Sequence, residues 1–322
     1  MPSIEIATSP LVPGVTPVRI HYRDAGHGLP IVILHGGWGY EIYPFDRQID
    51  ALAARHRIVI PDRSGYGGSG PIQALPTDFH QRAMEETRAF IDALDLERPV
   101  LWGHSDGAIV ALLVGLAAPN RIGGAIVEAA HYYKDKPGSR AFFEGIIGNP
   151  QSLGGGVAAV MRRDHGERWP AIVDMHSRTW LRIAEEAASP VEDFYGGRLP
   201  DLQVPVLVVH GAQDPRTEPG ELDALRAALD RRAEALRHTF VVLAEGGHSP
   251  HSERATADAV TRAAHDFIAN LTSNTPEAAH GSSDVAQGPS DVAQDPSDVA
   301  QGPSDVAQGP SDVAQGFSPA KS

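Results

Sequence analysis

Short β-branched and apolar runs alternate with stretches of helical periodicity along about the first 273 residues of the chain. Several of these runs are apolar throughout, which is typical of strands that are covered on both faces of a sheet. The runs are Val18–Tyr22, Ile31–Leu34, Arg57–Ile60, Val100–Trp102, Ala125–Val127, Val206–Val209 and Phe240–Leu243. The alternation predicts an α/β fold with a mostly parallel central sheet flanked by helices.

Helical spacing of apolar residues appears between and after these runs. It is found at Asp78–Leu94, Gly107–Ala117, Glu221–Leu229 and Thr256–Leu271. The segment 131–200 contains no convincing strand and instead predicts helices over Arg140–Ile147, Val157–Arg163 and Trp169–Ala187. A helical insertion between two strands is expected to cap the strand ends. We therefore expect residues 1–130 and 201–273 to form the core and residues 131–200 to form a helical cap.

A low-complexity repeat ends the chain. Five copies of a seven-residue unit, SDVAQGP with small variations, begin at Ser283 and carry one Val and one Ala each. Such a composition cannot offset the entropy of ordering, so residues 274–322 are predicted to be a disordered tail without a role in catalysis. From Pro276 onward the tail has a charge of −6, out of −14 for the whole chain. A net acidic chain argues against nucleic acid as the main partner.

Several kinds of protein are excluded by simpler features. Cysteine is absent, which removes disulfides, thiolate catalysis and thiolate-bound metals. The N-terminus lacks the pattern of a secretory signal, and no apolar stretch reaches the ~20 residues that span a membrane, so we expect a cytoplasmic protein without a membrane partner. None of the 15 histidines has zinc-site spacing, so no metal is expected. The sequence does not indicate the oligomeric state.

A G-x-G-x-x-G pattern at Gly65–Gly70 follows a predicted strand and resembles a dinucleotide-binding turn. Such a site also needs a helix that opens on the third glycine and holds the pyrophosphate. Pro71 and Pro76 follow instead and disfavour a helix there. The sequence therefore predicts a plain turn at this position and no organic cofactor.

The motif Gly103-His104-Ser105-Asp106-Gly107 lies between a predicted strand and a predicted helix. A serine on such a sharp turn adopts a strained backbone conformation that presents its hydroxyl at the edge of the sheet. The two glycines allow the close approach of the strand and the helix that the turn requires. Ser105 is therefore the expected nucleophile of an acyl-transfer reaction.

A serine hydroxyl needs a base that removes its proton and an acid that orients the base. In this architecture the acid and the base follow the serine in that order along the chain. Asp214 follows the strand Val206–Val209, and His248 follows Phe240–Leu243, so these two are the predicted acid and base. His251 is the weaker alternative base, and Glu128 is the rival acid.

Backbone N–H donors must also face the oxyanion that forms during acyl transfer. The N–H of Asp106, directly after the serine, is one expected donor. The loop His35-Gly36-Gly37-Trp38-Gly39 follows another strand, and the N–H of Gly37 is the second expected donor, with Trp38 as the alternative.

These motifs together resemble the α/β-hydrolase superfamily, in particular its cap-bearing serine hydrolases. The resemblance covers roughly residues 18–271 and includes Asp62–Ser69, which matches a D-x-S-G-x-G-x-S segment of that branch. It implies the nucleophile, acid and base roles of Ser105, Asp214 and His248. Haloalkane dehalogenases and soluble epoxide hydrolases carry an aspartate as nucleophile, so the serine argues against both.

The Ser-Asp pair at 105 and 106 resembles the valacyclovir-hydrolase-like esterases, in which the acid after the nucleophile helps to bind an amino group. This resemblance raises the hypothesis that Asp106 binds a cationic substrate. The alternative is that its carboxylate is favoured at a helix N-terminus by the helix dipole.

The expected activity is hydrolysis of a small ester, with Trp38, His104 and His131 as candidate wall residues of the substrate pocket. The same three catalytic groups also support cleavage of a carbon–carbon bond, a lactone or an N-terminal amide. A non-catalytic receptor for a small ligand is the alternative from another class. The sequence does not identify the acyl or alcohol group.

Overall fold

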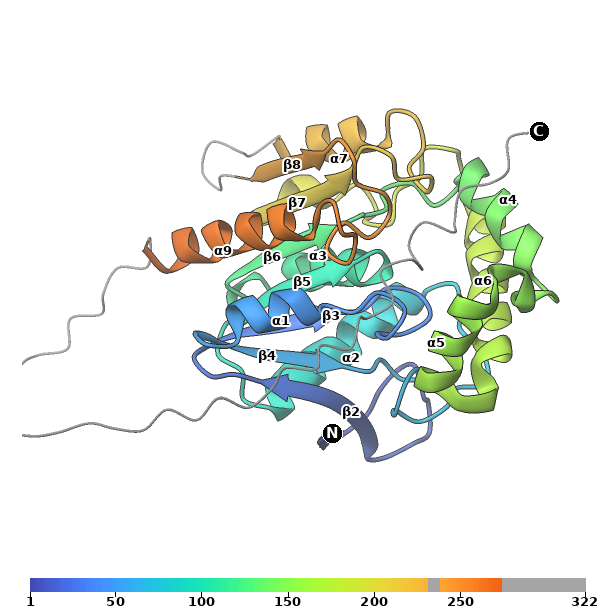
Figure 1. Cartoon of the computed structure of the whole chain (residues 1–322), viewed down its shortest axis with the longest axis horizontal. Helices are drawn as coiled ribbons and strands as arrows, with labels where there is room; N and C mark the ends of the chain where they lie inside the picture. The colour runs from blue at the N-terminus through green and yellow to red at the C-terminus, as the bar shows by residue number, and fades with distance from the viewer. Residues whose placement is uncertain (231–237, 274–322) are drawn as a thin grey trace, which may run out of the picture.

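A central sheet of eight strands runs through residues 1–230 and 238–273, which are the residues that the computed structural model describes (Figure 1). The strands are β1 (Ser3–Ile6), β2 (Val18–Ala25), β3 (Leu29–Leu34), β4 (His56–Pro61), β5 (Val100–His104), β6 (Gly124–Glu128), β7 (Val206–Gly211) and β8 (Thr239–Leu243). Their order is β1-β2-β4-β3-β5-β6-β7-β8. The strands from β4 to β8 pair in parallel, and only the β1–β2 and β2–β4 pairs are antiparallel. The predicted α/β class with a mostly parallel sheet is confirmed.

Two local elements were not predicted from the sequence. One is β1, which extends the antiparallel edge of the sheet by pairing Ser3 with His21 and Ile6 with Val18. Only Ile6 of β1 is buried, so the segment has no apolar run that would mark it as a strand. The other is α1 (Asp46–Leu52), which is only seven residues long. It buries Gln48 and Leu52, too few apolar positions for a clear helical pattern.

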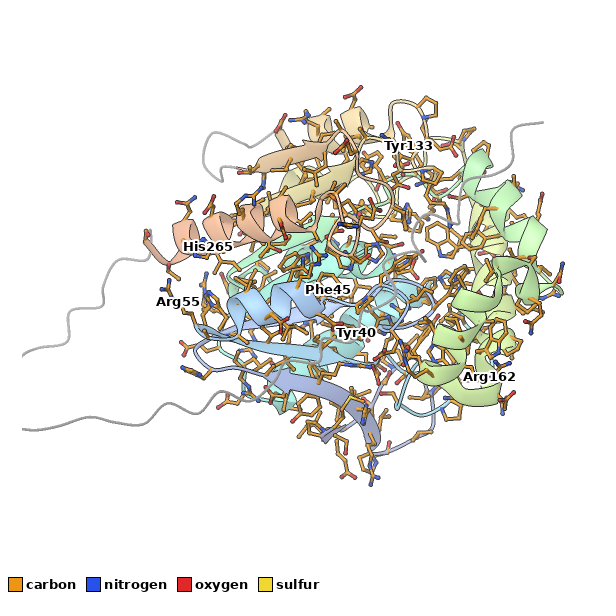
Figure 2. The ribbon with its side chains drawn as sticks, viewed as in Figure 1. Tyr40, Phe45, Arg55, Tyr133, Arg162 and His265 are labelled. Carbon is orange, nitrogen blue, oxygen red and sulfur yellow. The ribbon has the colours of Figure 1, made fainter. Side chains whose placement is uncertain are left out.

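Side chains alternate between the two faces of the central strands, and helices cover both faces. Ile31 and Ile33 of β3 face one cluster, whereas Val32 and Leu34 face the other. The first cluster is covered by α1 together with α9 (Ala257–Ser273), which lie in front of the sheet in Figure 1. Figure 2 labels Phe45 at the start of α1, where its ring packs edge-on against Trp102 of β5.

The second cluster is covered by α2 (Phe79–Ala93) and α3 (Asp106–Ala117). All residues of α3 up to Gly115 are buried, as expected for a helix of small and apolar residues that packs closely behind the sheet. Apolar residues on both faces of β3 explain why this strand is an unbroken apolar run in the sequence.

Three helices lie between β6 and β7, and they stand together at one end of the sheet in Figure 1. They are α4 (Pro137–Ile146), α5 (Gly155–His165) and α6 (Trp169–Glu186). Their positions agree with the helices expected in segment 131–200, with ends that differ by a few residues. The division into a core and a separate cap stays a prediction, and the predicted tail, 274–322, lies outside the described residues.

One further helix, α7 (Glu221–Asp230), follows β7. Among the residues that the structure describes, we find no helix that combines the length and the apolar character needed to cross a membrane.

Candidate active site

Ser105 lies on a sharp turn between the end of β5 and the start of α3. Its backbone has φ 53° and ψ −117°, a conformation that a non-glycine residue rarely adopts. A Cβ atom on Gly103 would lie 2.1 Å from the carbonyl oxygen of Gly107, and one on Gly107 would lie 2.0 Å from that of Leu34. Both positions therefore require glycine, and the motif forms the strained strand-to-helix turn expected of a nucleophile elbow.

The structure brings together the three side chains that the sequence singled out as nucleophile, base and acid. His248 Nε2 lies 3.2 Å from Ser105 Oγ, and His248 Nδ1 lies 3.0 Å from both carboxylate oxygens of Asp214. Burial alone raises the pKa of Asp214, but the charge and hydrogen bond of His248 outweigh burial and hold this pKa well below its usual range. Asp214 is therefore an ionised carboxylate that fixes the imidazole with Nε2 facing the serine.

The two alternatives from the sequence, Glu128 and His251, bind each other instead. His251 Nδ1 lies 2.7 Å from Glu128 Oε1, and His251 Nε2 lies 3.0 Å from the carbonyl oxygen of Tyr43. The imidazole also stacks on Phe45 with 3.7 Å between the ring centroids. Both residues are fully buried, and within the described ranges neither side chain bonds to the Ser105 hydroxyl. Their arrangement is that of a structural pair.

A second imidazole, that of His131, also contacts the serine. His131 Nε2 lies 3.2 Å from Ser105 Oγ, and His131 Nδ1 lies 2.7 Å from Lys136 Nζ. Lys136 is in turn paired with Glu221 at 2.8 Å, and both side chains are almost fully buried. Because an ammonium group can only donate, the hydrogen-bond network assigns the proton of neutral His131 to Nε2. His131 thus donates to Ser105 Oγ, which leaves the serine proton directed at His248.

The two N–H groups predicted to bind an oxyanion are available for that purpose. In residues 1–230 and 238–273, neither the N–H of Gly37 nor that of Asp106 donates to a protein acceptor. Gly37 lines the same cavity as Ser105, and a Cβ atom there would lie 2.3 Å from the His176 ring. Because of this short distance, position 37 requires glycine, and the N–H of Gly37 remains a predicted donor. Trp38, the alternative donor, has a φ of 75°.

The carboxylate of Asp106 is bound by the protein itself. His176 Nε2 lies 2.8 Å from Oδ2, and His80 Nε2 and Trp180 Nε1 lie 3.1 and 3.2 Å from Oδ1. Burial alone raises the pKa of Asp106, but His176 and His80 hold it well below its usual range. Asp106 is 1% exposed and does not line the cavity. This arrangement argues against the hypothesis that Asp106 binds a cationic substrate.

A cavity of about 320 Å³ lies against Ser105. Its apolar wall comprises Trp38, Tyr43, Phe142, Phe143, Trp180 and Pro215. Its polar wall comprises Ser105, His104, His131, His176, Arg216 and His248. The three predicted wall residues, Trp38, His104 and His131, therefore all lie on this cavity. Its volume is at the low end for small-molecule sites, which favours a small substrate.

Four site residues had no signal in the sequence: Lys136, Glu221, His176 and Arg216. They lie directly before α4, at the start of α7, within α6 and in the loop after β7, and none belongs to a recognisable motif. Only the folded chain brings them to the site. No group of three or more His, Cys, Asp or Glu side chains in the described ranges could hold a metal ion.

Buried neutral histidines around the site are expected to make the fold sensitive to acid. Burial, reinforced by the charge of Arg63, lowers the pKa of His35 to about 3. Burial, reinforced by His251 and His248, lowers the pKa of His104 to about 3 as well. The unfolded chain titrates near 6.5, so each histidine contributes stability that is complete above about pH 6.5 and is lost as the pH falls toward 3.

The free energy of unfolding should therefore decrease between pH 7 and pH 5, by at most about 1.4 kcal/mol per pH unit for each histidine. Urea unfolding at constant ionic strength measures this slope. His104→Gln should make the slope shallower, whereas His265→Gln, at an exposed position of α9, should not change it. An unchanged slope in His104→Gln would contradict the assignment.

The chain is similar to several known proteins. A family model described as "Alpha/beta hydrolase family" matches residues 31–263. The mouse protein named serine hydrolase BPHL is 28% identical over 265 residues, which are 79% of this chain and 84% of the mouse protein. A 2-hydroxy-6-oxononadienedioate/2-hydroxy-6-oxononatrienedioate hydrolase of Paraburkholderia xenovorans is 34% identical over 116 residues, 33% of this chain and 38% of that protein.

Solved structures share the fold at lower identity. A thermophilic esterase from Thermogutta terrifontis has a TM-score of 0.62 at 20% identity, covering 84% of this chain and 99% of the esterase. A meta-cleavage product hydrolase from Pseudomonas fluorescens also has a TM-score of 0.62, at 19% identity, covering 82% of this chain and 98% of that one. These likenesses extend over nearly the whole length of both solved chains.

Proposed function

The chain belongs to the alpha/beta hydrolase family, and we propose that it is a serine hydrolase that cleaves a small carboxylic ester through an acyl-enzyme intermediate. The observation that carries the proposal is the hydrogen-bonded series from Ser105 Oγ through His248 to Asp214. Fold alone does not select a reaction, so the proposal depends on this geometry and on the cavity against the serine.

In the first half of the reaction, Ser105 Oγ attacks the ester carbonyl and His248 Nε2 takes the hydroxyl proton. The N–H groups of Gly37 and Asp106 stabilise the negative oxygen of the tetrahedral intermediate, and Asp214 stabilises the imidazolium. The intermediate collapses, and the alcohol leaves with the proton from His248. In the second half, His248 takes a proton from water and the resulting hydroxide attacks the acyl carbonyl. The second tetrahedral intermediate then collapses, and His248 returns the proton to Ser105 Oγ as the acid is released.

Other bonds could be cleaved by the same residues. Relatives named as hydrolases of 2-hydroxy-6-oxononadienedioate favour carbon–carbon bond hydrolysis as the second candidate, because the same serine and histidine support that reaction. Lactone and N-terminal amide hydrolysis also remain compatible with the site. We place the ester first because its cleavage needs only the serine, the histidine, the acid and the two N–H donors described above.

The proposal is tested by reacting the full-length chain with an aryl phosphonate, which modifies activated serines covalently. We expect loss of turnover of 4-nitrophenyl butyrate in proportion to labelling, with one label per chain on the peptide that contains Ser105. Turnover rates measured with panels of lactones, amides and vinylogous 1,5-diketones then show which type of bond is cleaved fastest. Binding of small esters without turnover or labelling would instead indicate a non-catalytic receptor.

A further inference from the structure

Arg216 lies two residues after Asp214, in the loop that follows β7. Its backbone N–H donates to Asp214 Oδ1 at 2.8 Å, so the acid of the site anchors this loop. Its Nε donates to Ser139 Oγ at 3.2 Å, and its guanidinium carbon lies 4.4 and 4.5 Å from the ring centroids of Phe142 and Phe143. Contacts with α4 therefore hold the guanidinium in one place on the cavity wall.

This guanidinium has no carboxylate partner in the part of the chain that the structure describes, because no Asp or Glu oxygen lies within 4.0 Å of its nitrogens. The cavity wall contains no Asp or Glu. The nearby carboxylates are bound elsewhere: Asp214 to His248, Glu221 to Lys136, and Asp106 to His176. Within the same residues, the two terminal nitrogens of Arg216 donate to no protein acceptor.

An unpaired guanidinium that is partly buried on the wall of the cavity favours an anionic ligand. A charge removed from water is costly unless an opposite charge and hydrogen bonds compensate it. The planar guanidinium has four N–H donors on its terminal nitrogens, and this fork matches the two oxygens of a carboxylate. The rings of Phe142 and Phe143 orient the plane through cation–π contacts but supply no counter-charge.

We propose that Arg216 binds a carboxylate of the substrate, so that the preferred substrates are small esters that carry a second, ionised carboxyl group away from the scissile bond. The inference rests on the proposed ester hydrolysis and specifies its substrate class. The aromatic wall formed by Trp38 and Trp180 suits a short apolar linker between the ester and the carboxylate. The small volume of the cavity favours monoesters of short dicarboxylic acids or short acyl esters of a hydroxy acid.

The test compares matched charged and neutral substrates. One pair, the 4-nitrophenyl monoester of glutaric acid and 4-nitrophenyl pentanoate, places the charge on the acyl side. The other pair, the butyrates of 4-hydroxybenzoic acid and of phenol, places it on the alcohol side. For each pair, the charged-to-neutral ratio of kcat/KM is measured in wild type and in each variant. Any difference in intrinsic reactivity between the two esters cancels when the ratio of a variant is compared with that of wild type.

In Arg216→Met the ratio should fall about 10- to 100-fold for at least one pair, as expected for losing hydrogen bonds between charged groups. Arg216→Lys keeps the charge but loses the fork, so its ratio should fall less. The matched control is Arg140→Met on α4, the helix that contacts Arg216, where Arg140 pairs with Asp135 away from the cavity. That variant should keep the wild-type ratio. Unchanged ratios for both pairs in Arg216→Met would overturn the proposal and leave Arg216 as a packing residue.

A binding measurement separates this inference from the proposed function. If no ester is hydrolysed, the proposed function fails, and calorimetry with glutarate still decides the inference about Arg216. Binding to wild type that weakens at least tenfold in Arg216→Met, but not in Arg140→Met, supports the carboxylate site. Equal binding to all three proteins, or none to wild type, overturns it. Circular dichroism of each variant establishes that it is folded.

Discussion

Replacement of Ser105 by alanine is expected to lower kcat for ester hydrolysis by up to about 10⁶-fold, as found when a triad nucleophile is removed. Alanine lacks the Oγ atom that lies within 3.2 Å of both His248 and His131, so no acyl-enzyme can form. The residual rate should come from the oxyanion donors and from substrate binding alone. Steady-state kinetics with 4-nitrophenyl butyrate, on protein free of contaminating esterase, measures the effect.

A matched serine-to-alanine control lies on α6, where buried Ser177 donates to the carbonyl oxygen of Val173. Ser177→Ala removes a similar hydroxyl from a position without contact to the cavity, so activity should stay within a few-fold of wild type. If Ser105→Ala retained more than about a thousandth of the activity, the serine would not be the nucleophile. A water molecule activated by the flanking histidines would then be the better explanation.

The fold and the three residues of the proposed triad could be predicted from the sequence because each depends on a local pattern. Ser105 is bounded by two glycines, a strand and a helix, and Asp214 and His248 each follow an apolar strand. Parallel strands bring their carboxyl ends to one edge, so the order along the chain was enough to group these side chains.

The second set of contacts to Ser105 could not be predicted in this way. Lys136 and Glu221 are 85 residues apart, and nothing local marks them as an ion pair between the residue before α4 and the start of α7. Asp106 illustrates the same difficulty within the motif itself. Its place after the serine indicates what its N–H does, but the partners of its carboxylate come from α2 and α6. Pairing across distant segments is determined by packing, which a single sequence does not show.

At Arg216, the contrast between the local sequence pattern and the packing of the folded chain changes the expected substrate. The motif around Ser105 suggested a carboxylate that attracts a cationic substrate, whereas the folded site presents a guanidinium to the cavity. The acids near the cavity are bound by His176, His248 and Lys136. The cavity wall therefore carries the Arg216 guanidinium and no carboxylate, although the chain as a whole has a formal charge of −14.

Replacement of Asp214 by asparagine should lower kcat about 10⁴-fold, because it changes which nitrogen of His248 carries the proton. Asp214 Oδ1 accepts the backbone N–H of Arg216 at 2.8 Å, and an amide oxygen would keep that bond. The amide NH₂ group would then face His248 Nδ1 and favour the tautomer with the proton on Nε2. In that tautomer Nε2 cannot accept the proton of Ser105. The loss should appear in kcat for all esters, with little change in the ester preference.

Glu128→Gln is the matched control, because Glu128 is another buried carboxylate that binds a histidine. Its partner His251 does not bond to the Ser105 hydroxyl, so kcat should stay within a few-fold of wild type. The hydrogen bond between His251 and an ionised carboxylate is lost, which should lower the free energy of unfolding by about 1–3 kcal/mol. The two variants thus separate catalysis from stability, and kinetics with urea unfolding measures both. A large loss of kcat in Glu128→Gln, with Asp214→Asn nearly unaffected, would make Glu128 the acid that supports the base.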